Sequence, residues 1–78
     1  PVAYKLRGKV LEVHAQPLQA TVEHEAIPGY MGAMAMKFPL KDARLARTLK
    51  PGDLIKATLY LSQTNGEWWL ADVSVRKK

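Results

Sequence analysis

Three side chains that could ligate a metal ion lie close together in the sequence: His24, Met34 and Met36. On a strand, residues two apart leave the same face with Cα atoms about 6.5–7 Å apart, so the two methionines would share a face. Methionine has three rotatable bonds, and both sulfurs could therefore reach one point. We expect His24 to end the preceding strand, about 4.8 Å away if the strands pair. The spacing predicts one imidazole and two thioethers around a single ion.

The chemistry of these donors limits the ion that they could hold. A thioether sulfur is neutral and soft, so it is a poor ligand for Mg²⁺, Ca²⁺ or Zn²⁺ and favours Cu(I) and, by the same logic, Ag(I). A neutral donor set also suits reversible binding. The residues alone leave an alternative open, because methionines on a strand commonly belong to the core and a histidine at a strand end commonly faces solvent or makes a hydrogen bond.

The elements that must position these side chains are predicted to be strands, because polar and apolar residues alternate along most of the chain. Pro28-Gly29 and Asn65-Gly66 are strong turn signals, and Asp42 is a plausible cap for one short helix. The expected strands are 4–13, 18–24, 33–40, 53–62 and 67–75, and the expected helix is 41–50. This order indicates an all-β fold, a small five-stranded OB-type Greek-key barrel with a short helical connector between strands 3 and 4. An SH3-like barrel is the alternative.

Two strands carry a detail beyond simple alternation. In the first, the pattern slips where Val10 and Leu11 are adjacent, and this slip together with Gly8 predicts a β-bulge or a coiled strand. In the last strand we expect Trp68 to point outward. The inward side chains there are expected to be Trp69, Ala71, Val73 and Val75.

Composition excludes several classes of function. The chain has 78 residues, of which 47% are hydrophobic and 24% charged, and this predicts one small globular domain over 1–78. It has no cysteine, so disulfides, zinc knuckles and thiol catalysis are excluded. No apolar run approaches the ~20 residues of a membrane-spanning helix. We find no Ser–His–acid set and no glycine-rich phosphate loop, and therefore expect no enzyme.

A net charge of +5 raises the question of anionic partners. The basic residues expected on one face are Lys5, Arg7, Lys9 and Lys56. OB barrels often bind single-stranded nucleic acid through such faces combined with stacking aromatics. Few aromatics are expected to face outward here and none alternates with the basic stripe. We therefore expect no nucleic-acid partner, and a nucleic-acid or protein-docking module without metal is the alternative function.

One stretch of the sequence is familiar as a motif: His24-Glu25-Ala26-Ile27-Pro28-Gly29-Tyr30-Met31-Gly32-Ala33-Met34-Ala35-Met36-Lys37-Phe38. It resembles the signature of the CusF-like periplasmic copper/silver-binding domains. Gly8-Lys9-Val10 and Leu49-Lys50-Pro51-Gly52-Asp53 fit as well, so the similarity extends over nearly the whole chain. Members of this family are five-stranded OB-type barrels that bind Cu(I) or Ag(I). They occur as free metallochaperones or fused to the membrane-fusion subunit of a heavy-metal efflux pump.

The resemblance implies that the family's ligands carry over to His24, Met34 and Met36. It also implies a periplasmic domain, monomeric in isolation, that hands Cu(I) or Ag(I) to components of an efflux pump. A chain that begins at Pro1 resembles the fused form, such as the C-terminal domains of SilB-type efflux proteins.

The motif departs from the family at one position. The founding chaperone has a tryptophan three residues before its first methionine ligand, which caps the metal by a cation–π contact. Met31 stands there in this chain, so the tryptophan's role does not transfer. Three roles stay open for Met31: a fourth, weaker sulfur donor, a hydrophobic lid, or neither. Tyr30 is an alternative cap, and Trp68 and Trp69 are expected to serve packing.

Overall fold

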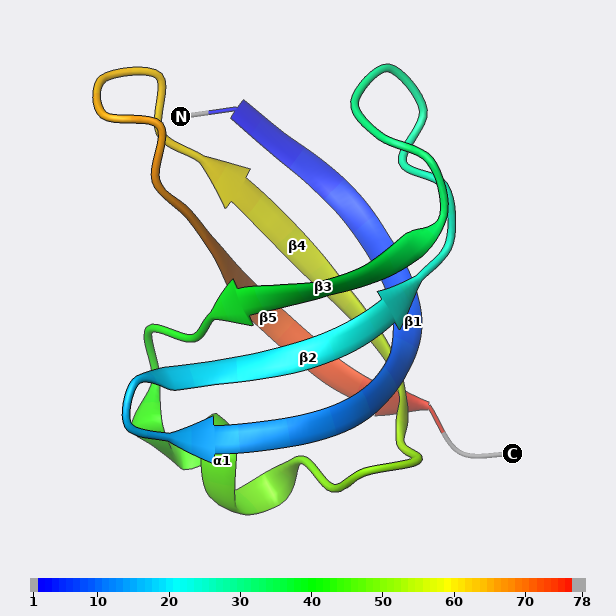
Figure 1. Cartoon of the computed structure of the whole chain (residues 1–78), viewed down its shortest axis with the longest axis vertical. Helices are drawn as coiled ribbons and strands as arrows, with labels where there is room; N and C mark the ends of the chain where they lie inside the picture. The colour runs from blue at the N-terminus through cyan, green and yellow to red at the C-terminus, as the bar shows by residue number, and fades with distance from the viewer. Residues whose placement is uncertain (1, 77–78) are drawn as a thin grey trace.

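The computed structural model describes residues 2–76, which form five strands and one short helix (Figure 1). The elements are β1 (Val2–Ala15), β2 (Leu18–His24), β3 (Met34–Pro39), α1 (Ala43–Thr48), β4 (Leu54–Leu61) and β5 (Trp68–Arg76). Each element begins and ends within two residues of its predicted bounds. The expected single domain over 1–78 also includes Pro1, Lys77 and Lys78, which lie outside the described residues.

The strands form one antiparallel sheet in the order β3-β2-β1-β4-β5. The long, curved β1 pairs with β4 through its first half and with β2 through its second half, so the sheet bends around it (Figure 1). The two outer strands approach each other through a parallel bridge between Leu40 and Leu70. The sheet therefore curls into a barrel that is not fully closed between β3 and β5. This arrangement confirms the predicted OB-type barrel with a helical connector between β3 and β4.

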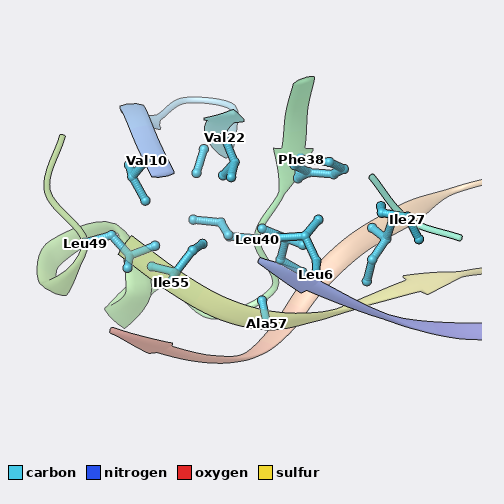
Figure 2. Packing of buried hydrophobic residues seen from close by; sticks show 12 residues of the cluster. Leu6, Val10, Val22, Ile27, Phe38, Leu40, Leu49, Ile55 and Ala57 are labelled. Atoms are coloured by element: carbon cyan, nitrogen blue, oxygen red, sulfur yellow. The ribbon is translucent and has the colours of Figure 1, made fainter. Parts of the chain in front are cut away.

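The core lies inside the curled sheet and is built from alternate residues of the strands (Figure 2). Burial of each large apolar side chain stabilises the fold by about 1.5–3 kcal/mol. Leu49, just beyond α1, joins the same cluster, and Ile27 enters it from the loop between β2 and β3. The buried hydrophobic residues are Leu6, Val10, Ala20, Val22, Ile27, Phe38, Leu40, Leu49, Ile55, Ala57, Leu59 and Leu70.

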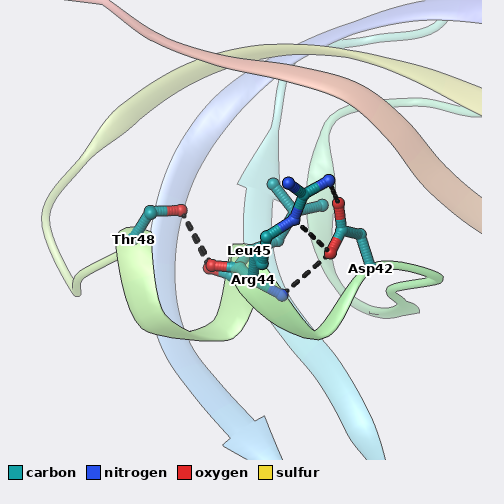
Figure 3. A network of polar contacts seen from close by, with 4 residues as sticks. All are labelled: Asp42, Arg44, Leu45 and Thr48. Carbon is teal, nitrogen blue, oxygen red and sulfur yellow. Dashed lines mark hydrogen bonds and ion pairs between the residues drawn. The ribbon is translucent and has the colours of Figure 1, made fainter.

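Local polar contacts hold the short helix α1 at its beginning (Figure 3). Asp42 is the N-cap, as predicted, and its carboxylate accepts a hydrogen bond from the backbone N–H of Arg44 at 2.9 Å. The Arg44 guanidinium also donates to this carboxylate at 3.0 Å, and these hydrogen bonds hold the pKa of Asp42 below its ordinary value. The cap thus fixes where the connector becomes helical.

The predicted slip in β1 is a β-bulge. Val10 pairs with Val22, but Glu12 pairs with Thr21, so Leu11 is an extra residue on β1. Gly8 itself lies in regular register, opposite His24 on β2 and Ile55 on β4. The sequence was therefore right about the bulge, whereas the glycine is explained by the close approach described below.

The predicted inward face of β5 is wrong over its first half. Leu70 is fully buried and Trp68 packs against the core, whereas Trp69 stacks on Tyr60 with ring centroids 5.7 Å apart. A bulge causes the error, because β5 carries one extra residue between the partners of Lys56 and Thr58. Beyond this bulge the phase changes, and Val73 packs against the core as predicted. Val75, which was also expected to point inward, is 46% exposed.

Candidate metal centre

His24 is the last residue of β2 and is almost completely buried, with an exposed fraction of 2%. It lies between Gly8 on β1 and Met34 on β3 in the pairing of the three strands. A Cβ on Gly8 would lie 2.6 Å from the Glu23 carbonyl oxygen and 2.9 Å from the Cα of His24. Glycine is required there because β1 and β2 approach too closely for any side chain. The close approach of β1 thus fixes the distance between Gly8 and the backbone of His24.

The hydrogen bond of the His24 ring fixes which nitrogen is free. Nδ1 lies 2.8 Å from the carbonyl oxygen of Glu25, and because a carbonyl only accepts, Nδ1 carries the proton. In the neutral ring, Nε2 then presents a lone pair. Nε2 is buried and has no hydrogen-bond partner among residues 2–76. A buried polar atom without a partner costs about 1–3 kcal/mol, and a metal ligand of this kind commonly donates its other N–H to a carbonyl.

The two methionines lie on the same sheet face as this imidazole. Met34 is the direct cross-strand partner of His24, which puts their Cβ atoms about 4.5–5.5 Å apart, and Met36 pairs with the next inward residue, Val22. Met34 is 47% exposed, whereas Met36 is half-buried against the core. The structure brings the three predicted residues together at one end of two paired strands. Their role as ligands stays a prediction.

The loop from β2 to β3 lies beside this end of the barrel and is anchored at three points. Ile27 is buried, and its N–H donates to the Met31 carbonyl at 2.8 Å, which closes a tight turn. Tyr30 stacks on Tyr4 of β1 with ring centroids 4.9 Å apart. Met31 is half-buried against the core. Of the two candidate caps, Tyr30 has one ring face committed to Tyr4, and Met31 is partly used in packing.

A row of aromatic rings begins beside the imidazole, and the sequence analysis did not place its central member, Trp68. Phe38 lies 5.6 Å from the His24 ring and 5.2 Å from Trp68, and Trp68 meets Tyr30 edge-on at 6.3 Å. Trp68 therefore packs, as expected, but in the aromatic group next to the histidine. The bulge of β5 lies beyond Trp68, so the residues after the bulge give no information about which face Trp68 is on. Only the spacing of two residues between Trp68 and Leu70 could have indicated that Trp68 points inward.

The other polar residues near the motif do not join the centre. The side chains of Glu23 and Glu25 are exposed on the opposite face, although the Glu25 carbonyl orients His24. His14 lies at the far end of β1, 3.7 Å from Glu12. Among residues 2–76, no three His, Asp or Glu side chains lie close enough to hold a metal ion. The described residues thus offer a soft-donor site and no cluster of hard donors.

Comparison with known proteins decides the family. The family described as copper binding periplasmic protein CusF matches residues 3–73, which is most of the chain. The chain belongs to the CusF family. It is therefore a copper/silver-binding domain of the periplasmic CusF type and not an enzyme. No helix among the described residues has the length and apolar character needed to cross a membrane.

Solved structures agree with this CusF fold. The C-terminal domain of SilB from Cupriavidus metallidurans has a TM-score of 0.81 and 26% sequence identity, with 100% of this chain and 93% of that domain covered. A crystal structure of Ag(I)CusF has a TM-score of 0.78 at 21% identity, with 97% and 100% covered. An Ag(I) form of CusF residues 10–88 from Escherichia coli has a TM-score of 0.77 and 20% sequence identity, with 99% of this chain and 95% of that chain covered. No curated protein matches the chain.

Proposed function

We propose that this CusF-family domain binds one Cu(I) or Ag(I) ion through His24 Nε2 and the thioether sulfurs of Met34 and Met36. The observation that carries the proposal is the buried, partnerless Nε2, which faces the side of the sheet that bears both methionines. A monovalent soft ion gives this nitrogen the partner that the protein does not supply. The neutral donors suit Cu(I) and Ag(I) and disfavour hard divalent ions.

The unequal burial of the donors supports a carrier function for the same site. His24 is held by its hydrogen bond to the Glu25 carbonyl and by the packing of β1, whereas Met34 is 47% exposed. An incoming sulfur donor from a partner can approach on the Met34 side and bind before an old ligand leaves. We infer that the ion passes by ligand exchange to a methionine-bearing component of a heavy-metal efflux system.

The test is an NMR titration with Ag(I), a redox-stable stand-in for Cu(I). We expect one equivalent to shift the His24 Nε2 resonance and the methyl resonances of Met34 and Met36, with Nδ1 still protonated. Met34→Leu should weaken binding by about 10–100-fold, as loss of a ligand or its support does in other sites. Met31→Leu is the matched control and should bind within about twofold of the wild type.

Three results would contradict parts of the proposed ligand set. A shift at His24 Nδ1 instead of Nε2 would contradict the assigned ligand atom. Equal affinity of the wild type and Met34→Leu would remove this sulfur from the site. A loss in Met31→Leu as large as that in Met34→Leu would identify Met31 as a fourth donor instead of a packing residue.

A further inference from the structure

The outer surface of β1, β4 and β5 carries a regular array of basic side chains. Strand pairing aligns Lys5 with Thr58, Arg7 with Lys56 and Ser74, and Lys9 with Leu54 and Arg76. The inward residues of β1 and β4 alternate with these positions, so the basic side chains point to the outside, where all are exposed. We call this surface the basic face, defined by Lys5, Arg7, Lys9, Lys56 and Arg76.

No cation of the basic face forms an ion pair within the described part of the chain. The ion pairs found among residues 2–76 are Asp42–Arg44 and Glu12–His14, and neither includes a cation of this face. Arg7 and Lys56 are direct cross-strand partners, and like charges in this position destabilise a sheet. An anionic group bound between them would remove the repulsion and gain two attractive contacts.

The surface between these side chains is hollowed. A recess of about 310 Å³ lies among Arg7, Lys9, Leu54 and Arg76, with Glu23 and Glu25 on its far side. A second recess of about 210 Å³ is lined by Lys5, Arg7 and Lys56. Arg7 lines both, so the two recesses are neighbours along β1. Leu54, which is 38% exposed, gives the larger one an apolar floor.

We propose that the basic face docks an extended, acidic protein segment that runs along β1. Lys5, Arg7 and Lys9 are two residues apart, about 6.5–7 Å, which is also the repeat of side chains on one face of an extended peptide. Carboxylates at alternate positions of such a segment would meet successive cations. Glu23 on β2 is the cross-strand partner of Lys9, and Glu25, just beyond β2, donates its backbone N–H to the Arg7 carbonyl; both carboxylates repel acidic groups. They therefore confine the segment to the β1/β4 side.

The aromatic residues nearby favour a peptide over a nucleic acid. Tyr60 and Trp69 continue the same outer surface beyond Lys5, since Tyr60 pairs with Ala3 and Trp69. These two rings stack on each other, and the Lys41 ammonium lies 5.0 Å from the Trp69 ring centroid. Because each ring already stacks on the other and Trp69 also has Lys41 beside it, less ring surface is free to stack on bases. Recognition of a partner on this surface therefore depends on charge contacts along β1.

Docking here leaves the candidate metal centre accessible. Side chains of the basic face leave the sheet on the side opposite His24, since Arg7 and Lys9 flank Gly8, the cross-strand partner of the histidine. A partner held on the outer face could therefore stay bound while Met34 exchanges an ion. The proposal does not depend on the metal site and is tested with the metal-free domain.

The test uses a synthetic peptide with glutamate at alternate positions and threonine between them, titrated into the domain at about 0.15 M salt. We expect amide shifts confined to β1, β4 and β5, and no binding of the same peptide with glutamine in place of glutamate. The double variant Arg7→Glu/Lys56→Glu should weaken binding by at least about tenfold. Lys37→Glu/Lys50→Glu makes the same change in net charge elsewhere and should weaken it by about twofold or less, because salt screens distant charges.

A gentler variant, Arg7→Gln/Lys56→Gln, replaces the reversal if circular dichroism shows that the double glutamate does not fold. Equal losses in the basic-face and control variants would reduce the effect to net charge and overturn the proposal. Binding of oligothymidine or of phosphatidylglycerol vesicles through these residues, with no peptide binding, would overturn it in favour of another anion. The wild type and both double variants should bind Ag(I) equally, which separates this test from that of the metal centre.

Discussion

Replacing Gly8 with alanine tests whether the close approach of β1 positions His24. The added Cβ would lie 2.6 Å from both the Glu23 carbonyl oxygen and the Val22 Cγ1, where ordinary van der Waals contact begins at 3.4 Å. The backbone of β2 must therefore move by up to about 0.8 Å (3.4 − 2.6), because the carbonyl oxygen has no freedom to rotate away. The Cα of His24, 2.9 Å from the new atom, must move by about 0.5 Å (3.4 − 2.9).

Both stability and metal affinity should fall in Gly8→Ala. Overpacking of this kind destabilises by about 1–3 kcal/mol, and the reduced entropy of the unfolded chain returns about 0.4–1 kcal/mol. Urea unfolding should therefore give a net loss near 1–2 kcal/mol. We expect the affinity for Ag(I) to fall by about 10–100-fold, as when the support of a metal ligand is disturbed elsewhere.

Gly32→Ala is the matched control because a Cβ there meets nothing within 4 Å. It makes the same chemical change in the loop before Met34 and should leave both quantities unchanged or raise stability slightly. Wild-type stability of Gly8→Ala would refute the close approach of β1 and β2. A destabilised Gly8→Ala domain that binds Ag(I) normally would refute the idea that this contact positions His24.

Two further predictions concern the core and the helix cap. Phe38→Ala should destabilise the domain to urea by about 3–5 kcal/mol, since this ring is fully buried; a loss under about 1 kcal/mol would contradict its place in the core. Asp42 has a pKa held below 3.8 by Arg44, so its contribution is present above that pH and disappears in stronger acid. Asp42→Ala should therefore lower the melting temperature at pH 7 but not at pH 2, and an equal loss at both would show that the charge is irrelevant.

The alternation of polar and apolar residues predicted the strands, because each strand has one solvent-exposed and one buried face. Five such strands can enclose a small core in only a few arrangements. It failed in β5, where Asp72, at φ 52°, lies in the extra stretch that changes the phase. A bulge on β1 was predictable because two apolar residues became adjacent there. On β5 the aromatic pair Trp68 and Trp69 hid the choice of face, since either ring could be buried.

The candidate site was predictable in its side chains but not in its backbone. Spacing placed Met34 and Met36 on one face and His24 across from them, and the observed register agrees. The tautomer depends on the Glu25 carbonyl, and the reason for Gly8 depends on the distance between two strands. Neither is visible in a sequence, because the first depends on the backbone conformation at Glu25 and the second on how closely β1 and β2 pair.

The two ends of the proposed donor set differ in a way that suits an ion carrier. A ligand that is buried, hydrogen-bonded and pressed by a neighbouring strand loses little entropy on binding, so His24 can define where the ion sits. Met34 is exposed and flexible, so its sulfur can leave without disturbing the fold. If both donors were buried, release would require the barrel to open. If both were exposed, ordering them would weaken capture. In the proposed site, a fixed nitrogen beside a movable sulfur would allow the same barrel to take up the ion and to give it away.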